Sequence, residues 1–276
     1  MTINATLFIC FFTFMIQFTE TIVYGMRLSG LRTRQMAIAM SFVTTSLIVS
    51  RLSNMFQAPL LGTKVDAAIM IGTPAALTEL EFTFRLIIFA GFLGVVCGSL
   101  LTRTTVTLFE KAIQHFLVHG SIPKIVCTAL KPRSIMAILR SFRLPSFSAL
   151  RLISLKDIPK QFLIFNIILT SCYSIGVLCS LLAGAYLPEI RSTANQLSGI
   201  VNGIATILMT IFVDPSGARI TDQTFHGNRP ESHVVSVIFF MQMGKLLGTL
   251  LIAQLLFWPF TKYVMFFTEL LAGVFI

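Results

Sequence analysis

The sequence has few charged residues and very few acidic ones. Charged side chains make up 12% of its 276 residues, whereas soluble domains have about 25%. Only 11 residues are acidic against 21 Lys and Arg, which leaves a net charge of +10. The mean hydropathy is +0.85. So little charge excludes an ordinary soluble domain, and the composition predicts an integral membrane protein.

The sequence also lacks the motifs of common enzymes and metal sites. It has no Gly-x-x-x-x-Gly-Lys-Ser/Thr loop, no His-Glu-x-x-His and no Gly-x-Ser-x-Gly, so direct use of ATP, zinc proteolysis and serine hydrolysis are not expected. None of the five Cys forms a Cys-x-x-Cys pair, which favours small apolar side chains over disulfides or metal ligands. His115 and His119 lack a third ligand nearby in the sequence. We therefore expect a protein that is not an enzyme and uses no cofactor or metal.

Six apolar stretches are long enough, or nearly so, to cross a bilayer, which takes about 20 residues per helix. The first has no basic region before it and no small-residue cleavage site, so we expect a span and not a cleaved signal peptide. The apolar residues from Tyr263 to Ile276 either extend the sixth helix past Pro259 or lie along the interface. The pattern predicts an all-α, polytopic bundle of about six transmembrane helices. The six stretches run over Ala5–Tyr24, Met36–Gln57, Phe84–Leu101, Gln161–Tyr186, Gln196–Val213 and Val234–Phe260.

Loop charges predict the orientation of the chain. The first loop carries three Arg and no acid, and the third carries ten Lys and Arg between Arg103 and Lys160 with only Glu110 and Asp157 against them. Positively charged loops stay in the cytoplasm. We therefore expect the N-terminus outside and, with six spans, the C-terminus outside as well. A seventh span within residues 261–276 would move the C-terminus inside.

The chain is expected to have three parts: a transmembrane half over residues 1–101, a basic cytoplasmic loop over 102–160 and a second half over 161–276. Helical spacing of apolar residues predicts a helix over Val106–His119 that stops at Gly120. Prolines divide the rest of the loop into short basic and apolar pieces, typical of interfacial helices that contact anionic lipid heads. The alternative is a solvated connector. The basic charge is assigned to lipid and not to nucleic acid.

The two halves share a loose pattern. Arg34, Pro59 and Asp66 of the first half correspond in order to Arg191, Pro215 and Asp222 of the second. Each third helix carries Gly-x-x-x-Gly, a spacing that lets membrane helices approach closely, either within one chain or in a dimer. The pattern is consistent with an inverted repeat of three plus three helices, as in many transporters, or with coincidence in an apolar chain. The two glycine pairs are Gly94/Gly98 and Gly244/Gly248.

Polar residues form stripes within the apolar stretches. Such faces turn toward the bundle interior or a water-filled cavity, and a charge deep in a span is costly. Arg51 and Lys245 lie deep inside their stretches, so their cost demands a function. We expect the polar faces to line a translocation path for an anionic group. The candidate residues are Glu20, Arg27, Arg34, Arg51, Asn54, Gln57, Arg85, Arg191, Asn202 and Lys245.

The cations of this set are expected to form a ladder across the membrane. Arg51, Arg85 and Arg191 would line an outer chamber, Lys245 a middle point, and Arg27, Arg32 and Arg34 an inner mouth. Glu20 is assigned to the cytoplasmic end of the first helix, too far from Arg51 to pair with it, and is expected to neutralise Arg27, Arg34 or Lys245. Three simpler interpretations stay open: Arg85 pairs with Glu81 on the surface, Arg191 pairs with Glu189 or extends to the membrane interface, and the first-loop arginines only fix topology.

Three stretches identify the chain as similar to the Amj family of bacterial lipid II flippases: ETIVYGMRLSGLRTRQ from Glu20, RLSNMFQAPLLGTKVD from Arg51 and QLSGIVNGIATILMTIFVDP from Gln196. The resemblance covers nearly the whole length. It implies a plasma-membrane transporter that moves the undecaprenyl-pyrophosphate-linked peptidoglycan precursor from the inner to the outer leaflet, alongside MurJ-type flippases. The rival hypotheses are a carrier of another anionic lipid or solute, a membrane scaffold of cell-wall assembly, and an enzyme acting on polyprenyl phosphates.

Overall fold

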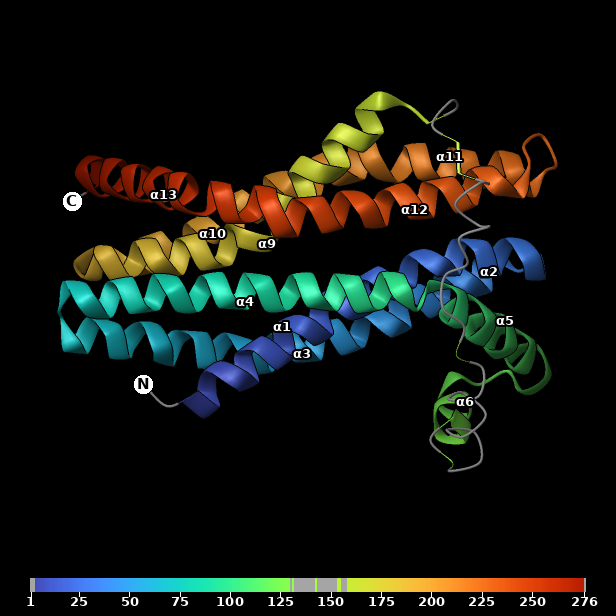
Figure 1. Cartoon of the computed structure of the whole chain (residues 1–276), viewed down its shortest axis with the longest axis horizontal. Helices are drawn as coiled ribbons and strands as arrows, with labels where there is room; N and C mark the ends of the chain where they lie inside the picture. Colours follow the sequence, from blue (N-terminus) through green and yellow to red (C-terminus); the bar gives the residue numbers. More distant parts are fainter. Residues whose placement is uncertain (1–2, 130, 132–141, 143–152, 155–157, 276) are drawn as a thin grey trace.

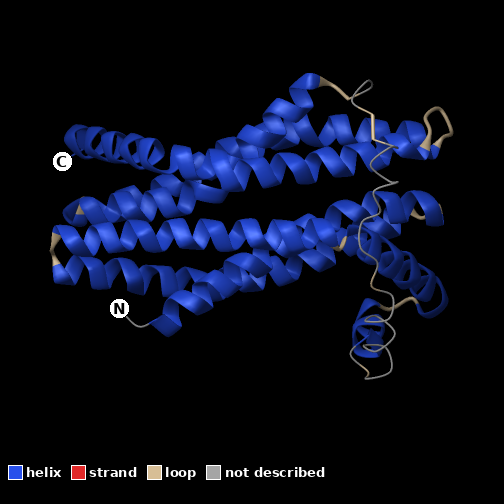
Figure 2. Ribbon diagram, viewed as in Figure 1, coloured by secondary structure: helices blue, strands red, loops and turns tan. Residues whose placement is uncertain are grey.

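The computed structural model describes residues 3–129, 131, 142, 153–154 and 158–275. Within this part of the chain every regular element is helical (Figure 2). The elements are α1 (Ile3–Ile22), η1 (Val23–Gly25), α2 (Met26–Thr33), α3 (Met36–Ile71), α4 (Pro74–Leu100), α5 (Thr102–His119), α6 (Ile122–Ala129), α9 (Lys160–Tyr186), η2 (Pro188–Ile190), α10 (Arg191–Leu208), η3 (Met209–Val213), α11 (Asp214–Phe225), α12 (Glu231–Leu247), η4 (Gly248–Ile252) and α13 (Ala253–Phe275).

Six helical segments are long and apolar enough to cross a membrane, which confirms the all-α, six-span prediction. Most of them are longer than the apolar stretches that predicted them. Successive elements that continue without a break, such as α10, η3 and α11, make up single spans. The spans are Asn4–Thr33, Met36–Ile71, Pro74–Leu100, Lys160–Tyr186, Pro188–Phe225 and Glu231–Gly273.

The stretch expected to be a basic turn between the first two spans is mostly helix. η1 and α2 continue α1 as far as Thr33, and only Arg34 and Gln35 form the turn, with Arg34 in the left-handed region at a φ of 54°. Ser29 explains how a polar stretch is buried here. Its hydroxyl donates to the carbonyl oxygens of Gly25 (3.2 Å) and Val106 (3.1 Å), so the hydroxyl keeps hydrogen-bond partners although it is buried against α5.

Each half of the chain is packed around its first helix. α1 contacts α4 and α3, while α9 contacts α10, α13 and α12. The Gly-x-x-x-Gly pairs form these contacts within the chain: a side chain at Gly94 would meet the backbone of α1, and one at Gly248 would lie 2.8 Å from the Ser171 hydroxyl of α9. The third helix therefore packs on the first in both halves. The inverted relation between the halves stays a prediction.

The two ends of the bundle differ in what they carry. The N- and C-termini lie together at one end, here called the terminal end, which also carries the α3–α4 turn (Figure 1). α2, α5 and the start of α12 lie at the opposite end, here called the loop end. α12, η4 and α13 run without a break from Glu231 to Phe275, so the final apolar residues extend the sixth helix past Pro259.

The long basic loop begins with two helices. The predicted helix is α5, and Gly120 ends it with a φ of 63°. Ile113 of α5 is fully buried in a cluster with Met26, Ala39 and Phe42, so α5 is part of the packed bundle. The interfacial helices expected beyond α6 fall mainly outside the described residues.

Candidate functional site

A polar pocket of about 300 Å³ lies between α1, α3, α9 and α10, near the middle of the first two spans. We call it the central pocket. It brings together five of the candidate residues from three helices: Glu20, Arg51, Asn54, Gln57 and Asn202. Its other polar lining residues are Thr13, Gln17, Ser50, Tyr173 and Ser174.

Lys245 of α12 reaches this pocket through an ion pair with Glu20. Its Nζ donates to Glu20 Oε2 at 3.0 Å, and the Lys245 side chain is only 4% exposed while Glu20 is 20% exposed. The hydroxyl of Ser50 donates to the other carboxylate oxygen at 3.2 Å. Because two buried opposite charges compensate each other in a region that cannot hydrate them, the pair adds no net charge to the pocket. Of the three partners expected for Glu20, which were Arg27, Arg34 and Lys245, the structure thus shows Lys245.

Arg51 is the uncompensated cation of the central pocket. Its side chain is exposed, and its guanidinium makes no ion pair or hydrogen bond with any residue the structure describes. Since Glu20 is already engaged by Lys245 and Ser50, the net charge of the pocket comes from Arg51. A guanidinium offers paired N–H donors whose geometry matches phosphate and carboxylate oxygens. An anion in the central pocket would therefore meet donors of matching geometry.

Two amide oxygens in the pocket have no hydrogen-bond partner among the described residues. They are Gln17 Oε1 and Asn202 Oδ1, both buried. Gln57, in contrast, is held by its Nε2, which donates to the Thr13 hydroxyl at 2.6 Å. A buried acceptor without a donor costs about 1–3 kcal/mol. Both oxygens are closed off from the open space of the pocket, and the Asn202 amide packs against Gly176 of α9, so they become available to a ligand only if the helices move apart.

The expected difference in depth between Glu20 and Arg51 is wrong, although no ion pair joins these two described residues, as expected. Both residues line the central pocket, and Ser50, next to Arg51 in the chain, bonds directly to Glu20. Glu20 is not at the end of its helix because α1 continues through η1 and α2 to Thr33. The extension of this helix places Glu20 at the same depth as Arg51.

The expected outer chamber of three arginines is also wrong. Arg85 is bound to Glu81 at 2.8 Å and donates to the Gln254 carbonyl oxygen at 3.0 Å, so the simpler interpretation of a local pair holds for it. Arg191 pairs with Asp66 of α3 at 2.7 Å and not with Glu189. Neither arginine lines the central pocket.

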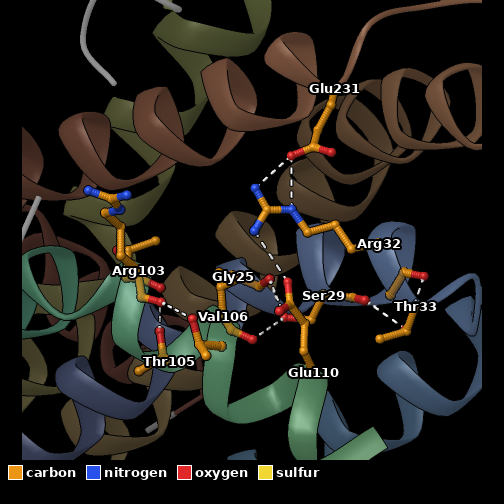
Figure 3. A network of polar contacts seen from close by, with 12 residues as sticks. Gly25, Ser29, Arg32, Thr33, Arg103, Thr105, Val106, Glu110 and Glu231 are labelled. Carbon is orange, nitrogen blue, oxygen red and sulfur yellow. Dashed lines mark hydrogen bonds and ion pairs between the residues drawn. The ribbon is translucent and has the colours of Figure 1, made fainter. Parts of the chain in front are cut away.

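The arginines of the expected inner mouth are spread over separate contacts. Arg27 lies 3.6 Å from Asp214 of α11. Arg32 pairs with Glu231 of α12 at 2.6 Å and with Glu110 of α5 at 3.2 Å (Figure 3). Arg34 is exposed at the C-terminal end of α2. Ion pairs between the two halves thus lie at both ends of the bundle: Arg27–Asp214 and Arg32–Glu231 at the loop end, and Asp66–Arg191 at the terminal end.

Sequence reasoning missed the contribution of α9 to the pocket. Tyr173 and Ser174 line it, beside Asn202 of α10. The signal was a group of polar residues within the fourth apolar stretch, which holds Thr170 and Ser171 as well. Gly176 explains why α10 lies so close, because a side chain there would collide with the Asn202 amide.

The described residues contain no group of three or more His, Cys, Asp and Glu side chains that could hold a metal. His115 and His119 stack on each other with ring centroids 4.1 Å apart. The five cysteines are free thiols.

Comparison with known proteins places the chain in a family. A family model described as "Amj: Alternate to MurJ" matches residues 12–268. The chain belongs to the Amj family. The Amj match includes every residue of the central pocket. A curated relative, the lipid II flippase Amj of Bacillus subtilis (strain 168), is 37% identical over 264 residues, which cover 95% of this chain and 96% of the relative.

No solved structure matches the chain. The six apolar helices and the Amj relative together identify a multi-pass protein of a bacterial membrane.

Proposed function

We propose that this Amj-family chain is a lipid II flippase that moves the undecaprenyl-pyrophosphate-linked peptidoglycan precursor from the inner to the outer leaflet of the plasma membrane. The observation that carries the proposal is the unpaired Arg51 in a membrane-embedded pocket whose other charges cancel. The 37% identity to a curated lipid II flippase supports the cargo. The activity makes and breaks no covalent bond.

The central pocket suits the part of such a lipid nearest the membrane. Arg51 binds the pyrophosphate through charge-assisted hydrogen bonds. When the helices around the pocket move apart, the unpaired amide oxygens of Gln17 and Asn202 would accept hydrogen bonds from sugar hydroxyls. A volume of about 300 Å³ is at the small end of ligand pockets. It holds the pyrophosphate and the adjoining sugar, so the remaining head group passes only when the helices around the pocket move apart.

The ion pairs at the two ends of the bundle would then act as closing contacts. Arg32–Glu231 joins the halves at the loop end, which loop charge assigns to the cytoplasm, and Asp66–Arg191 joins them at the terminal end, assigned to the outside. Alternate opening of these ends gives access from one leaflet at a time. Opening of the Glu20–Lys245 pair is our proposed link between transport and the proton gradient or the membrane potential. The N-terminus lies outside in this orientation.

The basic loop provides a second kind of contact with the membrane. Its cations would hold anionic lipid heads at the inner surface, since each Lys or Arg near an anionic membrane contributes about 1 kcal/mol. The scaffold hypothesis assigns this loop to cell-wall enzymes instead. It predicts that Arg51 and Lys245 can be replaced without loss of function.

Complementation tests the proposal directly. A host bacterium is depleted of its lipid II flippase and expresses this chain, and lipid II exposed on the outer leaflet is measured. Arg51→Gln is compared with Lys262→Gln, an exposed cation of α13 outside the central pocket. Membrane expression is checked for each variant.

We expect rescue by the native chain and by Lys262→Gln, and at least a tenfold loss of exposed lipid II for Arg51→Gln. No rescue by a well-expressed native chain would overturn lipid II as the cargo and favour another anionic lipid. Full rescue by Arg51→Gln would remove the central pocket from the mechanism.

A further inference from the structure

A second and larger pocket, of about 740 Å³, lies at the loop end between α2, α4, α5 and α12. We call it the loop-end groove. Its walls are mostly apolar, with Val96 and Leu100 on one side and Val235, Phe239 and Leu246 on the other. An apolar surface of this size between transmembrane helices matches a hydrocarbon chain better than a polar head group.

The groove carries one cation without a partner. Arg103, in the first turn of α5, is exposed and forms no ion pair with any described residue. Arg32 on the same groove is fully engaged, because its guanidinium bonds to Glu231 and Glu110. Figure 3 shows this contrast: dashed lines end on the guanidinium of Arg32 and none on that of Arg103.

Arg103 lies at the depth expected for lipid head groups. It follows the end of α4 at Leu100, where the third span stops, while the apolar walls extend back along α4 and α12 into the span. Arginine at such a boundary lies at the level of the lipid phosphates. The groove thus complements the two parts of an anionic lipid. Its apolar walls fit the hydrocarbon tail, and Arg103, at the membrane-surface end, fits the phosphate.

α12 connects the groove to the central pocket. Gln242 and Leu246 line the groove, and Lys245, between them on the helix, pairs with Glu20 of the central pocket. Three residues of α-helix advance only about 4.5 Å. Gln242 also donates to the Thr102 hydroxyl at 2.7 Å, which ties α12 to the start of α5 at the groove. A lipid in the groove is therefore next to the helix whose Lys245 pairs with Glu20 of the central pocket.

We infer that the loop-end groove is the loading site for the cargo lipid: it holds the polyprenyl chain of a polyprenyl pyrophosphate, with the pyrophosphate on Arg103, before the head group moves to Arg51. This inference rests on the proposed function, which supplies the cargo. A bulk phospholipid shares the same chemistry, a hydrocarbon tail with a phosphate, and is the occupant that the experiment has to separate.

Photo-cross-linking identifies the occupant. The full chain with Phe239→p-benzoylphenylalanine is placed in nanodiscs of phosphatidylethanolamine and phosphatidylglycerol that contain undecaprenyl pyrophosphate, and irradiated. Mass spectrometry of the adducts gives the ratio of polyprenyl to phospholipid labelling. Leu247→p-benzoylphenylalanine is the matched control, because Leu247 is exposed on the same helix but outside the groove.

Arg103→Gln then tests the cation, with Lys111→Gln as its control on the same helix. Lys111 is exposed and lies outside the groove. Hydrogen bonds to a charged group correspond to roughly 10- to 100-fold in affinity. Arg103→Gln is therefore expected to lower polyprenyl labelling at position 239 at least tenfold at limiting lipid, and Lys111→Gln to leave it within twofold.

A polyprenyl-to-phospholipid ratio at least tenfold higher at position 239 than at position 247 supports the inference. Three results would each overturn it: equal ratios at the two positions, adducts with phospholipid alone, and polyprenyl labelling that is unchanged by Arg103→Gln. Rescue in the complementation assay together with phospholipid adducts alone would reject the groove and keep the proposed function. Polyprenyl labelling without rescue would reject the flippase and keep the groove as a polyprenyl site.

Discussion

The ion pair between Glu20 and Lys245 offers the sharpest test of how this bundle is held together. It joins α1 of the first half to α12 of the second and is nearly buried. We compare Glu20→Gln, Lys245→Met and the double variant. Each single change leaves one charge without its partner inside the membrane span, whereas the double change removes both charges.

The expected magnitudes follow from the exposure of the two side chains. Removing one partner of a buried pair costs about 3–5 kcal/mol. Glu20→Gln should be near the upper end because Lys245, at 4% exposed, keeps an ammonium that cannot reach water. Lys245→Met should be near the lower end because Ser50 still donates to the carboxylate. Since 1 kcal/mol shifts the melting temperature of a domain of comparable size by about 2–4 °C, the single variants should lose roughly 6–20 °C.

The assay is the apparent Tm of the purified full-length chain in detergent, followed by light scattering or thiol-dye fluorescence. The double variant should melt at a higher temperature than either single variant. The matched control is the pair Asp66→Asn and Arg191→Gln, because these partners are just as close but about half exposed. Each of these changes should cost at most about 1 kcal/mol. A double variant that loses the sum of the two single losses, or a control pair as costly as the buried one, would refute the reasoning.

Three further predictions concern packing, the pocket and closure. Gly94→Ala puts a methyl group against the backbone of α1 and should lower the apparent Tm by several degrees, since overpacking costs about 1–3 kcal/mol. Gly199→Ala, in open space, should leave the apparent Tm unchanged, and equal effects of the two changes would contradict the close approach of α4 to α1. Gln17→Leu removes a buried, unpaired acceptor, so the free energy of unfolding should stay the same or rise by about 1 kcal/mol while complementation falls. A loss of both stability and complementation would mean that Gln17 has a structural role. Asp66→Asn breaks the ion pair at the terminal end and should speed labelling of Ser174→Cys by an impermeant thiol reagent several-fold, in a chain whose native cysteines are replaced; unchanged rates would exclude this contact as a closure.

Features set by local sequence were predictable. Apolar length alone predicted six spans, and Gly120 ended a helix because only a residue tolerant of positive φ fits there. The partner of Lys245 was also among those predicted, since a lysine deep in an apolar span needs an acid and Glu20 is the only acid within the six apolar stretches of the sequence.

The depths of the site residues were not predictable from apolar runs. The first apolar stretch ends at Tyr24, but the helix continues through η1 and α2 to Thr33, and the hydroxyls of Ser29 and Thr33 within that extension bond to carbonyl oxygens one turn earlier. That extension moves Glu20 from the end of a helix to the level of Ser50. Hydropathy measures how apolar a residue is and does not measure where its backbone hydrogen bonds end.

Ion-pair partners far apart in sequence were equally hidden. Arg191 has Glu189 close by in the chain yet bonds to Asp66, which is 125 residues away. Arg32 bonds to Glu231 across 199 residues. Local charge patterns cannot rank such choices, because the packing of whole helices decides which acid comes within reach.

The two chain termini share one end of the bundle (Figure 1), and this has a practical consequence for reporters. Complementary fragments of a split fluorescent protein, one on each end, would find each other within a single molecule and in a single compartment. Such a fusion would fluoresce when both termini reach the same side of the membrane, as an even number of spans requires. It would convert correct membrane insertion into an optical signal that needs no purified protein.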